Sequence, residues 1–144
     1  MIVYTVGTFD RLHVGHLRLL EHSQKLGCVV AAGVASDRVV HSYRPNKPVI
    51  PLEHRMQMRC ALRFVDIVIP DYELEYGSGC RTVAADIFVV GEAWGNKAHN
   101  FAVEAHMMDQ GGEIGKVQSD LRTASTQIKQ TVEAQPARTL AVAV

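Results

Sequence analysis

Apolar runs alternate with stretches of helical periodicity along most of the chain. Short runs rich in β-branched residues predict strands over residues 2–6, 28–34, 67–69 and 87–90, and a weaker strand over 113–117. Apolar positions at helical spacing predict helices over 17–26, 52–64, 81–85 and 101–109, and a last helix from Ser125 to just before Pro136. Residues 37–51 carry three prolines and many polar side chains, so we expect a loop there.

Strands and helices in alternation predict a parallel sheet with right-handed crossovers. The 144 residues suit one α/β domain, which we expect to be Rossmann-like, with about five parallel strands flanked by helices. We assign residues 1–135 to this domain and 136–144 to a C-terminal tail. In such sheets the ligand lies beyond the carboxyl ends of the strands. The first strand ends at Gly7 and the fourth at Gly91, so we look for chemistry at these two ends.

Composition excludes several classes of protein. Fifteen basic and fifteen acidic side chains give zero net charge, which argues against a protein that binds nucleic acid by bulk charge. The apolar runs are too short for a membrane span, and the first residues lack the basic region of a signal peptide. Cys28, Cys60 and Cys80 form no CxxC pair, so we expect free thiols and a cytoplasmic protein.

One motif directly after the first strand carries the strongest chemical signal. It reads Gly7-Thr8-Phe9-Asp10-Arg11-Leu12-His13-Val14-Gly15-His16. Gly7 permits a sharp turn, and Gly15 lets a ligand come close to the backbone. His13 and His16 are three residues apart, so both can face one ligand on a first helical turn, where free N–H groups attract an anion. Together these features predict a cradle for a polyphosphate.

Other interpretations of the histidines and glycines fit the sequence less well. A zinc site needs a third and usually a fourth ligand, and the remaining histidines are scattered, so we expect no metal held by the protein. The stretch over residues 111–116 looks like a phosphate-binding loop, but its spacing is short and Val117 replaces the required Ser or Thr.

The Gly-Thr-Phe-Asp and His-x-Gly-His elements resemble the signature of the cytidylyltransferase-like nucleotidyltransferases, and most closely that of glycerol-3-phosphate cytidylyltransferase. The resemblance runs from about residue 2 to 129 and includes Glu53-His54-Arg55 and Gly91-Glu92-Ala93-Trp94. It implies the HIGH-type nucleotidyltransferase fold. It also implies transfer of CMP from CTP to a small alcohol phosphate, such as glycerol 3-phosphate, with release of pyrophosphate.

The resemblance carries roles over to individual residues. His13, His16 and Arg122 take the catalytic positions, and Arg81 is the one cation available for the acceptor. The residues expected to bind nucleotide are Gly7, Thr8, Phe9, Asp10, Gly15, Arg44, Lys47, Arg55, Gly91, Trp94, Ser125 and Thr126. Asp10 is expected to shape the turn rather than to transfer protons.

Some of these roles have a plain structural alternative. Arg55 could instead form a surface ion pair on its helix, and Trp94 could cap the core. Arg122 could be a solvated loop residue, because the family's last motif, Arg-Thr-x-Gly-Ile-Ser-Thr-Thr, aligns with residues 122–127 only if Gly-Ile is deleted.

The implied reaction needs no nucleophile from the protein, because the phosphate of the acceptor can attack the α-phosphorus in line. Mg²⁺ would be held mainly by nucleotide phosphates and water. The expected partners are therefore CTP or ATP and a phosphorylated small molecule, with no nucleic acid and no membrane. Members of the family are usually dimers, so we also expect a homodimer.

Two other functions remain open at this point. The segment Lys47-Pro48-Val49-Ile50-Pro51-Leu52-Glu53-His54-Arg55 resembles the adenylyltransferase branch, which includes heptose-phosphate and FAD-forming enzymes that use ATP. The altered last motif and an acidic acceptor region, with Asp71, Glu73 and Glu75, suggest a nucleotide-binding protein that has lost catalysis.

Overall fold

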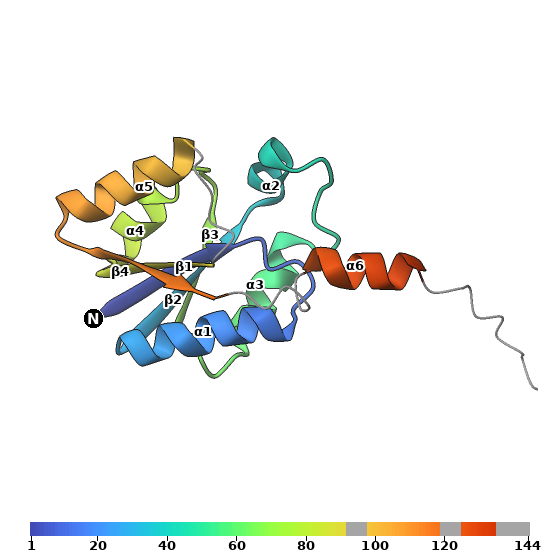
Figure 1. Cartoon of the computed structure of the whole chain (residues 1–144), viewed down its shortest axis with the longest axis horizontal. Helices are drawn as coiled ribbons and strands as arrows, with labels where there is room; N and C mark the ends of the chain where they lie inside the picture. Colours follow the sequence, from blue (N-terminus) through green and yellow to red (C-terminus); the bar gives the residue numbers. More distant parts are fainter. Residues whose placement is uncertain (92–97, 119–124, 135–144) are drawn as a thin grey trace, which may run out of the picture.

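Five parallel strands form the centre of the protein (Figure 1). The structure is a computed structural model that describes residues 1–91, 98–118 and 125–134. The strands are β1 (Ile2–Gly7), β2 (Val29–Ala35), β3 (Ile67–Asp71), β4 (Ile87–Gly91) and β5 (Glu113–Val117). They lie in the order β3-β2-β1-β4-β5, and every neighbouring pair is parallel. The predicted α/β fold with about five parallel strands is confirmed.

Helices cover both faces of this sheet. The described helices are α1 (Val14–Leu26), α2 (Asp37–Tyr43), α3 (Leu52–Cys60), α4 (Gly77–Val83), α5 (Ala98–Asp109) and α6 (Ser125–Ala134), and α6 extends away from the sheet (Figure 1). Figure 1 shows α4 and α5 on one face of the sheet, with α1 and α3 on the other. Within the described ranges, no helix combines the length and the apolar composition that a bilayer span requires. Cys28, Cys60 and Cys80 are free thiols.

Alternate residues of the central strands serve the two faces. Tyr4 and Phe88 pack with Val103 and Met107 under α4 and α5. Their neighbours along the strands point the other way, where Val3, Ile87 and Val89 meet Leu19 and Leu26 of α1. Because both faces are buried, the central strands β1, β2 and β4 are almost entirely apolar, with Thr5 as the exception, and do not alternate with polar residues.

The strand order places the ends of β1 and β4 side by side. From β1 the chain builds outward to β2 and β3, and then crosses to the other side for β4 and β5. Thr5 of β1 is in register with Val89 of β4, so the strand ends at Gly7 and Gly91 flank the point where the winding reverses. Such a switch point is where parallel α/β sheets bind their ligands.

The prediction of a loop over residues 37–51 is wrong for its first half, where α2 forms. Ser36 caps this helix by accepting a hydrogen bond from the amide of Val39 (3.2 Å). Val39 and Val40 are buried against Ala35 at the end of β2. The three prolines that suggested a loop all follow Tyr43, so they do not interrupt the helix.

Several other element boundaries also differ from the prediction. β3 continues through Pro70, which an edge strand tolerates because one side of its backbone has no partner strand. α3 ends at Cys60 rather than at residue 64. α4 begins at Gly77, four residues before the predicted start, because its glycines allow the helix to lie against β1.

Gly79 makes this close approach possible, and we predict that Gly79→Ala lowers the free energy of unfolding. A Cβ atom at Gly79 would collide with the buried hydroxyl of Tyr4. The overpacking costs about 1–3 kcal/mol and exceeds the gain of about 1 kcal/mol in helix propensity. Urea unfolding measures the change. Gly91→Ala is the control, because a Cβ atom there meets nothing within 4 Å. Equal midpoints for the two variants would contradict the prediction.

Candidate active site

The loop between β1 and α1 holds the two motif histidines at the switch point. Its backbone is strained, since Phe9 and Arg11 both have a positive φ of 49°. The ring of Phe9 is buried and folds back over Gly7, where an added Cβ atom would lie 3.1 Å from the ring. Gly7 therefore leaves room for the Phe9 ring, while the positive φ values of the turn lie at Phe9 and Arg11 rather than at Gly7.

His13 and His16 cap the start of α1 reciprocally. His13 is the N-cap residue, and its Nδ1 atom accepts a hydrogen bond from the amide of Gly15 (3.1 Å). The Nδ1 atom of His16 accepts from the amide of His13 (3.4 Å). The two imidazole rings stack with their centroids 3.8 Å apart. The structure thus brings the pair together as the spacing predicts, while its role in binding phosphate stays a prediction.

The caps also determine which nitrogen carries the proton. With both Nδ1 atoms accepting hydrogen bonds, each neutral ring holds its proton on Nε2 and can donate it to an anion. Burial, followed by the charges of His13 and Arg59, lowers the pKa of His16 to about 3. Burial and Arg59 also lower the pKa of His13 below its usual value. At neutral pH the pair consequently acts as two uncharged N–H donors.

One part of the expected anion cradle needs correction. The amides of Gly15, His16 and Leu17 all have partners, because the first binds the His13 ring and the other two donate to the carbonyl of His13. These three N–H groups are not free to bind an anion while the caps are in place. The imidazole rings keep their Nε2–H groups as donors for a phosphate in this arrangement.

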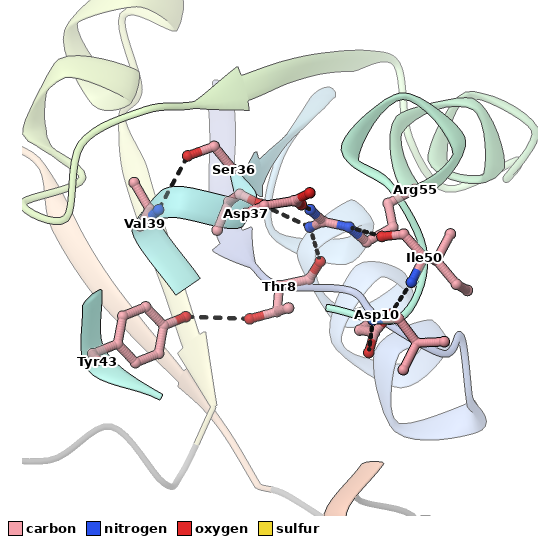
Figure 2. A network of polar contacts seen from close by, with 10 residues as sticks. Thr8, Asp10, Ser36, Asp37, Val39, Tyr43, Ile50 and Arg55 are labelled. Carbon is pink, nitrogen blue, oxygen red and sulfur yellow. Dashed lines mark hydrogen bonds and ion pairs between the residues drawn. The ribbon is translucent and has the colours of Figure 1, made fainter. Parts of the chain in front are cut away.

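Arg55 ties the active-site loop to the rest of the fold (Figure 2). Its side chain is fully buried. Nη1 donates to the carbonyls of Thr8 (2.6 Å) and Ala35 (2.7 Å), Nε donates to Ile50 (2.8 Å), and Nη2 pairs with Asp37. The alternative of a surface ion pair is wrong. Four of the five donors bind protein atoms, so Arg55 holds the backbone of the β1–α1 loop. Its expected role at a phosphate site stays a prediction.

Asp10 holds a second loop against the first. Its two carboxylate oxygens accept hydrogen bonds from the amides of Val49 (3.0 Å) and Ile50 (2.9 Å). These bonds fix the segment before α3 beside the β1–α1 loop, as Figure 2 shows. The prediction that Asp10 shapes the turn fits this geometry. Both oxygens are thus engaged in holding the second loop in place.

α2 adds residues that the sequence analysis missed. Tyr43 forms a hydrogen bond between its hydroxyl and Thr8 Oγ1 (3.2 Å), and Asp37 pairs with Arg55. Both lie in the segment predicted as a loop. Ser36 and Asp37, followed after Arg38 by Val39 and Val40, form a helix-start signal that could have revealed this helix.

Arg59 is the other residue that the sequence analysis missed. It lies one turn after Arg55 on the buried face of α3, and its side chain is fully buried. Its Nη2 atom donates to the carbonyl of Phe9 (3.0 Å), and its guanidinium carbon lies 4.4 Å from the centre of the Phe9 ring. The opposite face of α3 is different, with an open hollow of about 410 Å³ lined by Glu53, Met56, Gln57 and Cys60.

The remaining predicted residues fall into two groups. Arg44 and Lys47 are exposed beyond α2, and Arg81 is exposed on α4. No contact within the described ranges connects Arg81 to the β1–α1 loop. Trp94 and Arg122 lie outside the described residues. Ser125 and Thr126 begin α6, as predicted for the start of the last helix, but their side chains also lie outside the description. Where the chain is described, no three His, Cys, Asp or Glu side chains gather as metal ligands would.

Comparisons with known proteins agree with this geometry. A family model described as "Cytidylyltransferase-like" matches residues 4–134. The Bifunctional protein HldE of Pectobacterium carotovorum is 33% identical over 92% of this chain, and that of Yersinia pestis (strain Pestoides F) is 32% identical over 92%. The chain spans 28% of the length of these two relatives.

Solved structures share the fold. A lipopolysaccharide core biosynthesis protein from Thermoplasma volcanium aligns with a TM-score of 0.70 at 24% identity, covering 83% of this chain and 96% of that one. Thermotoga maritima TmcAL, solved with alpha-thio ATP, aligns with a TM-score of 0.63 at 13% identity, covering 92% of this chain and 50% of that one.

We predict that Arg55→Met lowers the free energy of unfolding by about 1–3 kcal/mol, because buried carbonyls lose their donors. Those carbonyls belong to Thr8, Ala35 and Ile50. The loss of the ion pair adds less, since Asp37 is half-exposed. Urea unfolding gives the difference. The exposed Arg38 of α2 supplies the control, and Arg38→Met should change stability by less than about 0.5 kcal/mol. Similar losses in both variants would be evidence against the role of Arg55.

The lowered pKa of His16 predicts that the folded protein loses stability as the pH is lowered. The folded pKa of about 3 lies below the ordinary 6.5, so the unfolded chain binds a proton first as the pH drops. The contribution is therefore complete above pH 6.5 and is lost as the pH falls toward 3. Between pH 7 and 4.5 we expect the wild type to lose up to about 2 kcal/mol more than His16→Gln. Unfolding curves at the two pH values measure this difference, and parallel losses would refute the assignment.

Proposed function

This chain belongs to the cytidylyltransferase-like family of nucleotidyltransferases, and from that premise we propose that it transfers AMP from ATP to a phosphorylated sugar and releases pyrophosphate. The observation that carries the proposal is the stacked pair of His13 and His16 at the switch point of the sheet. Their Nε2–H groups are suited to bind phosphate oxygens at the point where the nucleotide of a parallel α/β fold is expected.

The chemistry follows from two neutral donors. A phosphate oxygen of the acceptor attacks the α-phosphorus, and the bond from that phosphorus to the leaving pyrophosphate breaks. Negative charge grows on the oxygens during this transfer, and donors already fixed in place stabilise that charge without reorganising. The reciprocal caps fix both rings, and Arg55 and Asp10 hold the loop that carries them.

We infer that Mg²⁺ takes part through the nucleotide rather than through a protein cage. When bound, the ion neutralises charge on the phosphates and on the pyrophosphate product. Both oxygens of Asp10 already accept backbone hydrogen bonds. The β1–α1 loop carries no other carboxylate, and Mg²⁺ usually keeps several waters and binds through substrate phosphates.

The choice of ATP over the expected CTP has two supports. The relatives that match over 92% of this chain carry the name HldE. The segment 47–55 resembles the branch of adenylyltransferases that includes heptose-phosphate enzymes. In the structure this segment contains Val49, Ile50 and Arg55, which make the contacts that hold the β1–α1 loop.

The acceptor side favours a sugar phosphate over a simple alcohol phosphate. β3 ends at Asp71, and the chain after it carries Glu73 and Glu75 and no lysine up to residue 91. Carboxylates accept hydrogen bonds from hydroxyl groups and repel a bare phosphate. An acceptor rich in hydroxyls therefore suits this region, and the phosphate would point toward the histidines.

Two other functions are tested alongside this one. Transfer of CMP from CTP to glycerol 3-phosphate draws support from the segment Gly91-Glu92-Ala93-Trp94 and from the pair Arg122-Thr123. A nucleotide-binding protein without catalysis draws support from the shortened last motif. The homodimer and the cytoplasmic location expected from the sequence stay predictions.

A pyrophosphate-release assay separates these functions. ATP and CTP are each combined with heptose 1-phosphate, glycerol 3-phosphate and FMN. We expect release with ATP and the sugar phosphate, and at least about a hundredfold loss in His16→Ala, because a fixed donor to the transition state is removed. His41→Ala, at an exposed position of α2, is the control and should keep full activity.

Each remaining result points elsewhere. Turnover with CTP and glycerol 3-phosphate alone would replace the proposal with the cytidylyltransferase. Tight binding of nucleotide without turnover in any pair would favour a binding protein. Full activity in His16→Ala would contradict the role given to the histidines.

A further inference from the structure

Arg59 is a buried cation without a counter-charge. It is fully buried, and its Nε and Nη1 atoms have no hydrogen-bond partner, while Nη2 donates to the carbonyl of Phe9. No carboxylate in the described ranges pairs with it. Arg55, one turn earlier on the same helix, is equally buried but has Asp37 and three carbonyls as partners. The two arginines are therefore buried to the same extent and differ only in their hydrogen-bond and ion-pair partners.

Such a charge is costly in the folded protein. A buried ion loses its hydration, and without a partner this loss is not offset. Burial and the neighbouring charge of Arg55 lower the pKa of Arg59 to about 10, so the side chain remains a cation at neutral pH. An apolar or neutral side chain would fill this position at a lower cost. The unpaired charge therefore needs a reason other than the stability of the free protein.

The surroundings of Arg59 supply that reason. Its guanidinium lies over the ring of Phe9, with 4.4 Å between the guanidinium carbon and the ring centre. The Phe9 ring also makes an edge contact with His16 at 5.2 Å between centroids, and His16 stacks on His13 at 3.8 Å. The cation and the two imidazoles are thus linked through a single aromatic ring. In the low-dielectric interior of the protein, the charge of Arg59 acts on both imidazoles with little screening by water.

We propose that Arg59 is a positioning residue whose buried charge serves as the counter-charge of the polyphosphate bound at His13 and His16. It does not touch the ligand, and it acts by raising the electrostatic potential behind the two imidazoles and by holding the Phe9 backbone. The inference rests on the proposed function only in taking the β1–α1 loop as the polyphosphate site. It adds a residue that neither the motif nor the family comparison assigns.

The same charge adds to the effect of burial on the two histidines. Burial is the main cause of the lowered pKa of both imidazoles, and the positive charge of Arg59 lowers it further. The attraction for phosphate then comes from the arginine, and the directed hydrogen bonds come from the rings. A protonated pair stacked at 3.8 Å would instead place two like charges against one another.

The test compares Arg59→Gln, which keeps an amide donor but loses the charge, with Arg59→Lys, which keeps the charge. Calorimetry measures binding of inorganic tripolyphosphate and of adenosine, and thermal unfolding without ligand measures stability. Arg59→Gln should weaken tripolyphosphate binding at least tenfold, change adenosine binding less than threefold, and leave the melting temperature equal or higher. Arg59→Lys should bind tripolyphosphate within threefold of the wild type.

Arg63→Gln is the matched control. Arg63 is an exposed arginine whose guanidinium lies 4.8 Å from the centre of the Phe64 ring, so it shares the cation–ring contact but not the burial. This variant should bind both ligands as the wild type does. A tenfold loss of tripolyphosphate binding here would show that any cation on this side of the protein suffices, and would overturn the proposal.

Three other results would also overturn it. The first is a lower melting temperature or failure to fold in Arg59→Gln, since the charge would then serve stability. The second is unchanged tripolyphosphate binding in that variant. The third is equal loss for tripolyphosphate and adenosine. If the wild type does not bind tripolyphosphate, the β1–α1 loop is not a polyphosphate site and the proposal for Arg59 is wrong. If the wild type binds tripolyphosphate but shows no turnover, the proposed reaction is wrong, and the binding data for the Arg59 variants still test the role of this residue.

Discussion

The geometry of the candidate site depends on one buried guanidinium. Arg55 joins the β1–α1 loop at Thr8, the end of β2 at Ala35, the start of α2 at Asp37 and the segment before α3 at Ile50. These pieces are separate in sequence, and no strand pairing connects them beyond the sheet edge. Because the side chain is fully buried, water cannot replace its bonds. Through its bond to the carbonyl of Thr8, this side chain holds the strained β1–α1 loop that carries the histidines.

The second buried arginine on α3 follows a different logic. Arg55 is satisfied by the protein, while Arg59 has two buried nitrogen atoms without partners beside the histidine pair. α3 therefore places two cations against the β1–α1 loop. Arg55 maintains the structure of the loop, and Arg59 provides positive potential for a ligand. Natural proteins depart from local rules mainly at functional sites, and the difference between these neighbours marks where structural support ends and binding begins.

The sequence was sufficient for features with local causes. Apolar runs revealed the strands, and the glycine-flanked turn with two histidines at helical spacing revealed the centre of the site. The contacts of Arg55 were not predictable, since its partners are 5 to 47 residues away. Pro70 was misread because only the assembled sheet shows that β3 is an edge strand. Arg59 gave no local signal at all, since burial of a charged residue is a property of the tertiary structure.

Separating charge from hydrogen bonding has a physical advantage for phosphoryl chemistry. An exposed cation attracts counter-ions and water, and its field is screened within about 8 Å at physiological salt. A cation buried behind Phe9 is screened far less, and its position does not change as charge moves between phosphates. The imidazoles in front, held by their own backbone caps, supply direction without adding mutual repulsion. Together the two layers form the kind of preorganised environment that stabilises a developing charge.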